Sequence, residues 1–121
     1  MEYIHAMRVL LVDDEAEVRS YFVRALQRLR PELEVVEAAD GREALDYFLH
    51  MPFDLVLSDQ RMPRMSGIDL LREVRTHSAV PFVMISSDRY AEGEALHEGA
   101  SEYLSKPIGL HVLGAVLGRY L

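Results

Sequence analysis

The chain contains no cysteine, which excludes disulfide bonds and thiolate metal sites. It also lacks long hydrophobic runs: its apolar stretches have the length of strands, far short of the roughly 20 residues that a membrane-spanning helix needs. The N-terminus has neither the basic start nor the apolar core of a signal peptide. These absences make the cytoplasm the expected location, without membrane association.

Positive charge is scarce as well, since 20 Asp and Glu residues outnumber 13 Lys and Arg residues and give a formal net charge of −7. Such a domain repels nucleic acid phosphates, so we expect no direct nucleic acid binding by this chain. Clustered acids suit a divalent cation better. The histidines lack the spacing of an HExxH metal motif, and we expect all five to be solvated surface residues (His5, His50, His77, His97 and His111).

The 121 residues fit one domain, 1–121, without internal repeats, low-complexity tracts or linkers. Apolar segments predict strands at 7–12, 34–38 (at or near an edge), 53–58, 81–86 and 102–105. Helical patterns alternate with them, at 15–30, from Asp40, from Ser66, at 89–98 and at 109–120. Right-handed crossovers then give an α/β fold of the (βα)5 type: a doubly wound, five-stranded parallel sheet with helices on both faces.

Local signals set the helix boundaries. Asp40 and Ser66 have the positions of N-caps, and Gly99 fits the stop of the helix before it. The first helix has an apolar stripe at i, i+4, i+7, i+8 and i+11 (Val18, Phe22, Ala25, Leu26 and Leu29) and ends before Pro31. The last helix contains three glycines, each disfavoured by ~1 kcal/mol relative to alanine, so it either frays or depends on the packing of its apolar face (Leu113, Val116, Leu117 and Tyr120).

Four of the five predicted strands end on polar groups: Asp13-Asp14, Asp59, Ser86 and Lys106. Each signal alone is weak, because such residues also serve as helix caps, turn acids or solvated lysines. Together they are more informative, because the carboxyl ends of parallel strands meet at one edge of a sheet, where ligands bind.

The chemistry of this set points to phosphoryl transfer. Three crowded carboxylates raise one another's pKa unless a cation intervenes, and Mg²⁺ accepts such oxygen ligands at an open edge. A carboxylate can then act as the nucleophile toward a phosphoryl group. Lys106 and Ser86 offer a positive charge and a hydrogen bond to the transferred oxygens.

These residues, in this order, resemble a receiver domain of a two-component response regulator, with the flavodoxin-like fold of chemotaxis regulators. The matching segments run nearly end to end: Val-Asp13-Asp14-Glu, Ser-Asp59-Gln-Arg-Met-Pro-Arg-Met-Ser-Gly67, Met-Ile-Ser86-Ser and Tyr103-Leu-Ser-Lys106-Pro107. The family has Thr or Ser where Ser86 stands but commonly a small apolar residue at Ser87. The stretch between Asp59 and Lys106 is slightly short for the family, which we interpret as trimmed loops around the fourth helix.

The resemblance implies that Asp59 accepts a phosphoryl group from the phosphohistidine of a sensor histidine kinase or a phosphotransfer protein. Mg²⁺ (or Mn²⁺) would be bound directly by Asp14, through water by Asp13, by Asp59 and by the main-chain carbonyl of Arg61. Lys106 would contact the phosphoryl group, and Lys106-Pro107 would be a cis peptide. The domain would catalyse its own phosphorylation and dephosphorylation as a signalling switch, rather than act as an enzyme on other substrates.

The resemblance also implies an output mechanism. When Ser86 moves toward the phosphoryl oxygen, it vacates space that Tyr103 can turn inward to fill. The face of the fourth helix, fifth strand and last helix would then bind a downstream effector domain or protein, and a homodimer is a further option.

Three other functions share this topology. A flavodoxin-like electron carrier needs a hydroxyl- and glycine-rich loop where Asp13-Asp14-Glu15 stands, and a haloacid dehalogenase-type phosphatase needs an acid at position 61, which is arginine. A phosphorylation-independent interaction module usually lacks one of the key residues, and none is missing here. The sequence leaves open whether this receiver stands alone or belongs to a longer regulator or hybrid kinase.

One pair of charges flanks the expected site. Arg61 lies two positions after Asp59, and Asp88 lies two positions after Ser86. Either the two side chains meet across the path of the water that hydrolyses the phosphoryl group, or they are solvated and separate. The sequence does not decide between these alternatives.

Overall fold

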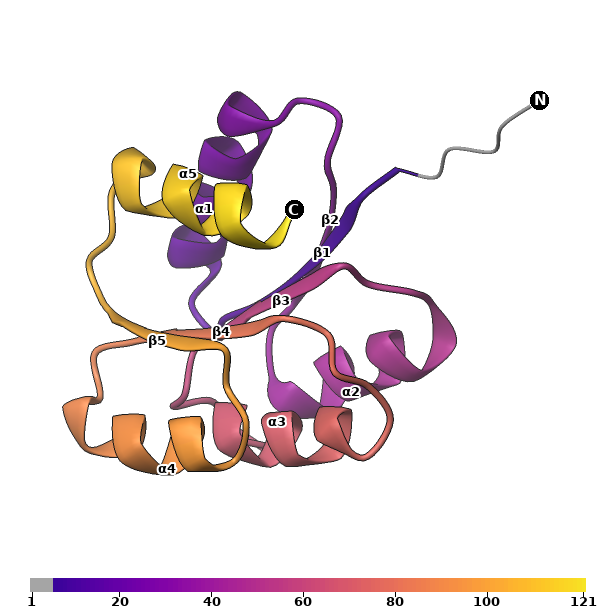
Figure 1. Cartoon of the computed structure of the whole chain (residues 1–121), viewed down its shortest axis with the longest axis vertical. Coiled ribbons are helices and arrows are strands. Elements are labelled where there is room, and N and C mark those ends of the chain that lie inside the picture. Colours follow the sequence, from indigo (N-terminus) through magenta and orange to yellow (C-terminus); the bar gives the residue numbers. More distant parts are fainter. Residues whose placement is uncertain (1–5) are drawn as a thin grey trace.

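The computed structural model describes residues 6–121, so the expectation for His5 lies outside the described residues. Its five parallel strands follow the order β2-β1-β3-β4-β5 (Figure 1), which confirms the predicted sheet and places β2 at an edge. The strands are β1 (Arg8–Val12), β2 (Glu34–Ala38), β3 (Leu55–Ser58), β4 (Phe82–Ser86) and β5 (Glu102–Ser105). The helices are α1 (Ala16–Leu29), α2 (Gly41–His50), α3 (Gly67–Arg75), α4 (Glu92–His97) and α5 (Leu110–Tyr120).

β2 and β5 have the predicted bounds, and the other elements differ from the prediction by up to three residues at a boundary. β3 starts two residues later than predicted, where the Asp54 side chain accepts the Arg8 backbone N–H at 2.8 Å. The helix predicted over 89–98 begins as a 3₁₀ turn (Arg89–Ala91), and only six residues form α4.

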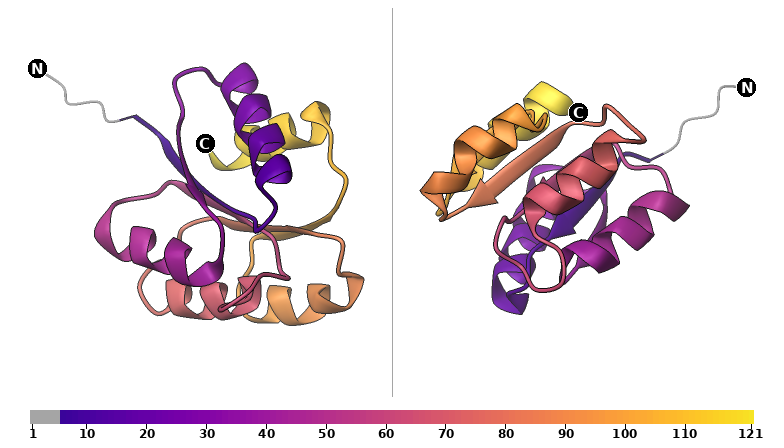
Figure 2. Two further views of the ribbon diagram at one scale, coloured as in Figure 1. Left: turned by 180° about the vertical axis from the view of Figure 1, so that it is seen from behind. Right: turned by 90° about the horizontal axis from the view of Figure 1, so that it is seen from below.

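The helices form two layers, with α1 and α5 on one face of the sheet and α2, α3 and α4 on the other (Figures 1 and 2). Side chains of β1 alternate between two cores, because successive strand residues point to opposite faces. Val9 and Leu11 pack with the α1–α5 side, whereas Leu10 and Val12 pack with the α2–α4 side. Burial of both faces explains why the central strands β1, β3 and β4 are mostly apolar runs.

Helix caps confirm the local signals. Asp40 and Ser66 accept the backbone N–H groups of Glu43 and Asp69, at 2.8 and 3.1 Å. After α4, Gly99 has a φ of +104°, and the next backbone N–H bonds back to the Ala95 carbonyl at 2.9 Å, which is a Schellman stop.

The α5 helix begins at Leu110, one residue later than predicted, and extends to Tyr120 despite its glycines. Leu113, Val116 and Leu117 are buried against α1 and the sheet, and Tyr120 lies partly buried beside them. Of the two alternatives, fraying or dependence on packing, the structure therefore favours packing of the apolar face as what stabilises α5. Among the described residues, no helix is both long and apolar enough to cross a membrane.

The strand order creates the position of the site. From β1 the chain first moves to β2 on one side and later to β3 on the other, so β1 and β3 flank the point where the winding reverses. In open α/β sheets, ligands bind in the crevice beyond the strand ends at this point. Asp13, Asp14 and Asp59 follow these two strands directly.

Candidate functional site

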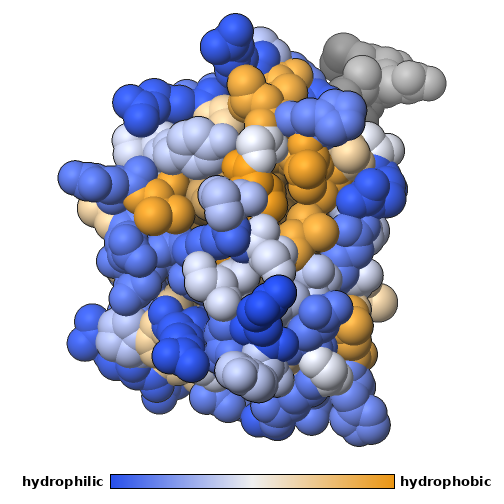
Figure 3. Space-filling view, turned by 90° about the vertical axis from the view of Figure 1, so that its left-hand side faces the viewer, coloured by the Kyte–Doolittle hydropathy of each residue, from blue (hydrophilic) through white to orange (hydrophobic). Residues whose placement is uncertain are grey.

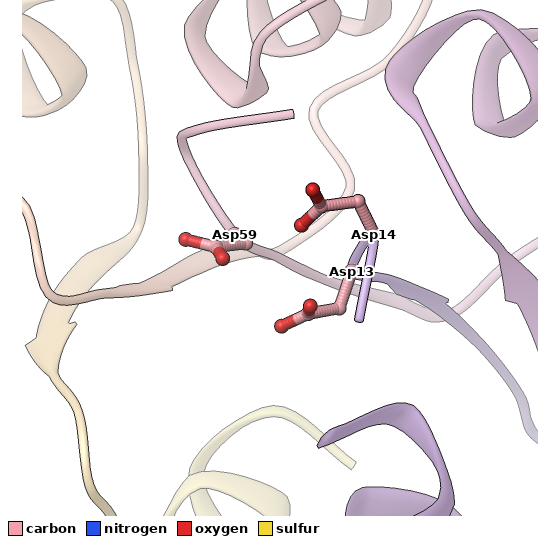
Figure 4. A group of neighbouring side chains, drawn as sticks. All are labelled: Asp13, Asp14 and Asp59. Carbon is pink, nitrogen blue, oxygen red and sulfur yellow. The ribbon is translucent and has the colours of Figure 1, made fainter. Parts of the chain in front are cut away.

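Three carboxylates meet at the carboxyl edge of the sheet, as predicted. One oxygen from each of Asp13, Asp14 and Asp59 lies within 4.8 Å of the others, and this is the one acidic, histidine or cysteine cluster of its kind in residues 6–121. Figure 4 shows the three side chains extending to the same side of the strand ends. Asp13 and Asp59 are only 3% and 9% exposed, whereas Asp14 is open to solvent.

Lys106 bridges the two buried acids. Its ammonium donates to Asp13 Oδ2 at 2.7 Å and to Asp59 Oδ2 at 2.9 Å. Burial of the ammonium opposes its charge, but the hydrogen bonds and charges of both carboxylates outweigh this effect and raise the pKa of Lys106. The cis Lys106-Pro107 peptide is present, as the resemblance implied.

Backbone amides fix the other oxygens of these acids. Asp13 Oδ1 accepts the Glu15 N–H at 2.9 Å, and Asp59 Oδ1 accepts the Gln60 N–H at 2.7 Å. Two of the three acids thus share one ammonium, and the third, Asp14, lies beside them. The excess negative charge and the all-oxygen donor set fit a divalent cation such as Mg²⁺.

Ser86 lies in the same site, 2% exposed at the end of β4. Its hydroxyl accepts the Asp88 backbone N–H at 3.1 Å. A cavity of about 460 Å³ joins Ser86 to the acids and opens to solvent; its walls include Asp14, Asp59, Arg61, Ser86, Asp88 and Lys106. Of the strand-end groups predicted from the sequence, Asp14, Asp59, Ser86 and Lys106 therefore meet at one opening, and Asp13 is joined to them through Lys106.

Tyr103 lies beside this opening. Its hydroxyl donates to the Asp88 main-chain carbonyl, and its ring packs partly buried against the core on the α2–α4 side. Burial raises the pKa of the Tyr103 hydroxyl. Ser86 thus accepts the N–H of Asp88, and Tyr103 donates to the carbonyl of the same residue, so both side chains contact Asp88 in the β4–α4 loop.

Arg61 and Asp88 do meet, so the two side chains are not separate; whether their contact obstructs the hydrolytic water stays a prediction. Arg61 Nε donates to Asp88 Oδ2 at 3.1 Å across the mouth of the cavity. This hydrogen bond holds the pKa of the Asp88 carboxyl below its usual value. The pair joins the loops that follow β3 and β4.

Two contacts near the site were missed by the sequence reasoning. Arg19 donates to the Asp13 main-chain carbonyl at 2.7 Å, and Arg64 donates to Asp40 at 2.9 Å. The sequence marked Asp40 only as a helix cap. Its distance from Arg64 along the chain left no local signal for the ion pair.

An apolar groove borders the site on the α1–α5 side. Its volume is about 450 Å³, and it is lined by Val18, Tyr21, Phe22, Pro107 and Ile108 together with Glu17 and Lys106. Figure 3 shows hydrophobic residues gathering on the upper part of this side of the molecule, the half that contains α1 and α5. The four described histidines are exposed, as expected.

The model of the response regulator receiver domain family matches residues 9–117. The chain belongs to this family. It is 39% identical over 119 residues to the regulatory protein AtoC of Escherichia coli K12, an alignment covering 94% of this chain and 25% of AtoC. Receiver domains of this fold are signalling switches.

Solved structures agree. The chemotaxis response regulator CheY4 of Vibrio cholerae superimposes with a TM-score of 0.87 at 34% identity, covering 97% of this chain and all of that one. The response regulator TrrA of Thermotoga maritima, solved in complex with Mg²⁺ and BeF, gives a TM-score of 0.86 at 28% identity and coverage of 95% and 99%. These likenesses confirm the flavodoxin-like receiver fold.

The chain spans only a quarter to a third of several curated relatives. Coverage is 25% of AtoC and 30% and 34% of two protein-glutamate methylesterase/protein-glutamine glutaminases, from Carboxydothermus hydrogenoformans and Syntrophus aciditrophicus. The shared part is the receiver region.

Proposed function

We propose that this receiver domain, taken as 1–121, accepts a phosphoryl group on Asp59. The observation that carries the proposal is the Asp59 carboxylate itself. It directly follows β3 at an open cavity, contacts Lys106 and has an oxygen within 4.8 Å of oxygens of Asp13 and Asp14. One Asp59 oxygen forms a bond to phosphorus while the bond from phosphorus to the histidine nitrogen of a kinase or phosphotransfer protein breaks. The nitrogen leaves with the electron pair of that bond.

The surrounding residues have separate roles in this proposal. Asp14 directly, Asp13 through water, Asp59 and the Arg61 main-chain carbonyl would hold Mg²⁺ or Mn²⁺. When bound, the cation supplies positive charge that offsets repulsion between the carboxylates and the phosphoryl oxygens. Lys106 places its ammonium beside the transferred group, and the Ser86 hydroxyl turns from Asp88 to donate to a phosphoryl oxygen.

Intact mass spectrometry after incubation with acetyl phosphate and Mg²⁺ tests this proposal. We expect one added phosphoryl group on the native chain and none with Asp59→Asn or with a chelator. Asp54→Asn is the matched control, because Asp54 is an acid at the opposite edge of the sheet, and this variant should retain the adduct. An adduct that persists in Asp59→Asn would refute the assignment.

The output is the second part of the proposal. Asp88 links Ser86 and Tyr103, so a shift of the Ser86 hydroxyl removes one hydrogen bond from the loop that Tyr103 holds. We infer that the face of α4, β5 and α5 then changes and binds an effector domain, an effector protein or a second copy. Amide hydrogen exchange with and without beryllofluoride should change on this face, and changes confined to α1 and α2 would contradict the inference.

The protein would act in the cytoplasm, and its partner upstream would be a sensor histidine kinase or a phosphotransfer protein. A phosphorylation-independent interaction module is the weaker alternative, since the acceptor, both further acids and the lysine are all in place.

A further inference from the structure

The loop between β3 and α3, residues 59–66, is closed at its base by hydrogen bonds to Gln60. The Gly67 N–H donates to the Gln60 carbonyl at 2.9 Å, and the Ile68 N–H donates to the Gln60 side chain at 2.8 Å. A β-carbon at Gly67 would collide with the Asp59 carbonyl oxygen and with Met84. The residue next to this base is Arg61, whose carbonyl is a proposed cation ligand.

The tip of the same loop is strained. Arg64 has a φ of +67°, the left-handed region that a side chain disfavours, and the Met65 N–H reaches back to the Pro63 carbonyl at 2.7 Å. A hydrogen bond from residue i+2 to residue i around a positive φ is the pattern of a strained γ-turn. Such a conformation persists only where other contacts hold it.

The contact that holds it comes from another strand end. Arg64 Nε donates to Asp40 Oδ2 at 2.9 Å, while Asp40 Oδ1 caps α2. The Asp40 side chain is only 6% exposed, although that of Arg64 is 71% exposed. Close packing accompanies the ion pair, because a β-carbon at Gly41 would lie 2.8 Å from the Met65 β-carbon. The strained tip therefore rests on the start of α2.

We propose that the Arg64–Asp40 ion pair is a positioning contact, which fixes the β3–α3 loop and so keeps the Arg61 carbonyl ready for the cation. Neither residue touches the cation in this proposal. It rests on the proposed function, since it assumes that the acidic cluster binds Mg²⁺ or Mn²⁺. Arg61 is then held from three points: the Gln60–Gly67 base, its own bond to Asp88, and the Arg64 tip.

Charge alone makes a different prediction, which allows a clean test. If the two residues affected the cation only through their charges, Arg64→Gln would strengthen cation binding, because it removes a positive charge. Asp40→Asn would weaken it, because it removes a negative charge. A positioning contact requires both variants to weaken binding. Asn retains an oxygen that can cap α2, so Asp40→Asn removes the charge without removing the cap.

The experiment measures Mg²⁺ affinity by calorimetric titration of the full chain, and amide hydrogen exchange of residues 61–65 without metal. We expect both variants to bind Mg²⁺ about tenfold more weakly, as changes that disturb ligand orientation do. Exchange in the loop should be faster in both. The double variant should be no weaker than the single ones, because both remove one contact. Glu34→Gln, which breaks an ion pair at the opposite edge, is the matched control and should change neither quantity.

Native affinity or tighter binding in Arg64→Gln, or unchanged loop exchange in both variants, would overturn the positioning role. Failure of the native chain to bind Mg²⁺ would instead refute the proposed function. The exchange measurement needs no metal, so it still decides in that case whether the ion pair holds the loop.

Discussion

Acidic residues lie at both ends of the parallel strands, but their burial and their pairing with positive charges differ between the two ends. At the edge where the strands begin, Arg8 pairs with Glu34 at 2.8 Å, and Asp54 accepts the Arg8 backbone N–H. At the end where the strands finish, Asp13, Asp14 and Asp59 lie together, and Lys106 contacts the first and the last of them. The Glu34 side chain is 50% exposed, whereas those of Asp13 and Asp59 are 5% and 10% exposed.

This difference separates structural acids from functional ones. Water screens an exposed pair, which adds little to stability and creates no need for a ligand. Buried carboxylates that outnumber their cations leave negative charge that a divalent cation can neutralise. Burial and charge balance together therefore distinguish the site, while the mere presence of acids does not.

The largest expected effect comes from removing the one ammonium in the site. Lys106→Met leaves Asp13 and Asp59 uncompensated, and we expect a loss of about 3 kcal/mol in the free energy of unfolding without Mg²⁺. Arg8→Met at the opposite edge should cost about 1 kcal/mol or less. Urea unfolding of both variants makes the comparison, and equal losses would remove the distinction between the edges.

A kinetic effect is expected at the mouth of the cavity. If the Arg61–Asp88 pair obstructs the attacking water, Arg61→Ala and Asp88→Ala should each speed dephosphorylation, by up to about tenfold. The double variant should be non-additive, because each change removes the same contact. Hydrolysis rates of the phosphorylated chain provide the measurement, and strictly additive effects would show that no such gate exists.

A smaller effect on the free energy of unfolding is expected when the pH is lowered and the Asp40 carboxylate becomes protonated. The Glu43 N–H and the Arg64 guanidinium outweigh burial and lower the pKa of this carboxyl below 3.8. A lowered pKa stabilises the fold above the unfolded-state pKa, and that stability is lost as pH falls through the folded-state pKa. Between pH 6 and pH 3, the native chain should therefore lose more stability than Asp40→Asn. Urea unfolding at both pH values tests this, and equal losses would mean that Asp40 does not contribute.

Much of this architecture could be predicted because its signals are local. Caps at Asp40 and Ser66 and the stop at Gly99 depend on neighbouring residues, and the apolar period of each segment sets its type. The strand-end residues were predictable as a group because parallel strands share one carboxyl edge. Asp13, Asp59, Ser86 and Lys106 accordingly meet where expected.

The remaining features depend on contacts between distant segments. Arg64 and Asp40 are 24 positions apart, and neither residue type indicates in the sequence that the other is its partner. The same holds for Arg61 and Asp88, whose meeting depends on the conformation of two loops rather than on the sheet. Long side chains on loops can reach several partners, so the sequence pattern alone does not choose among them.

Thermal unfolding with increasing Mg²⁺ tests most directly whether the buried, acid-rich edge is the one that binds a cation. At about 100 times the dissociation constant, a ligand that binds only the folded state contributes about 2.7 kcal/mol. We predict this stabilisation for the native chain and for Glu34→Gln, and a much smaller one for Asp14→Asn. Equal upward shifts in the native chain and in Asp14→Asn would place the cation elsewhere and contradict the account.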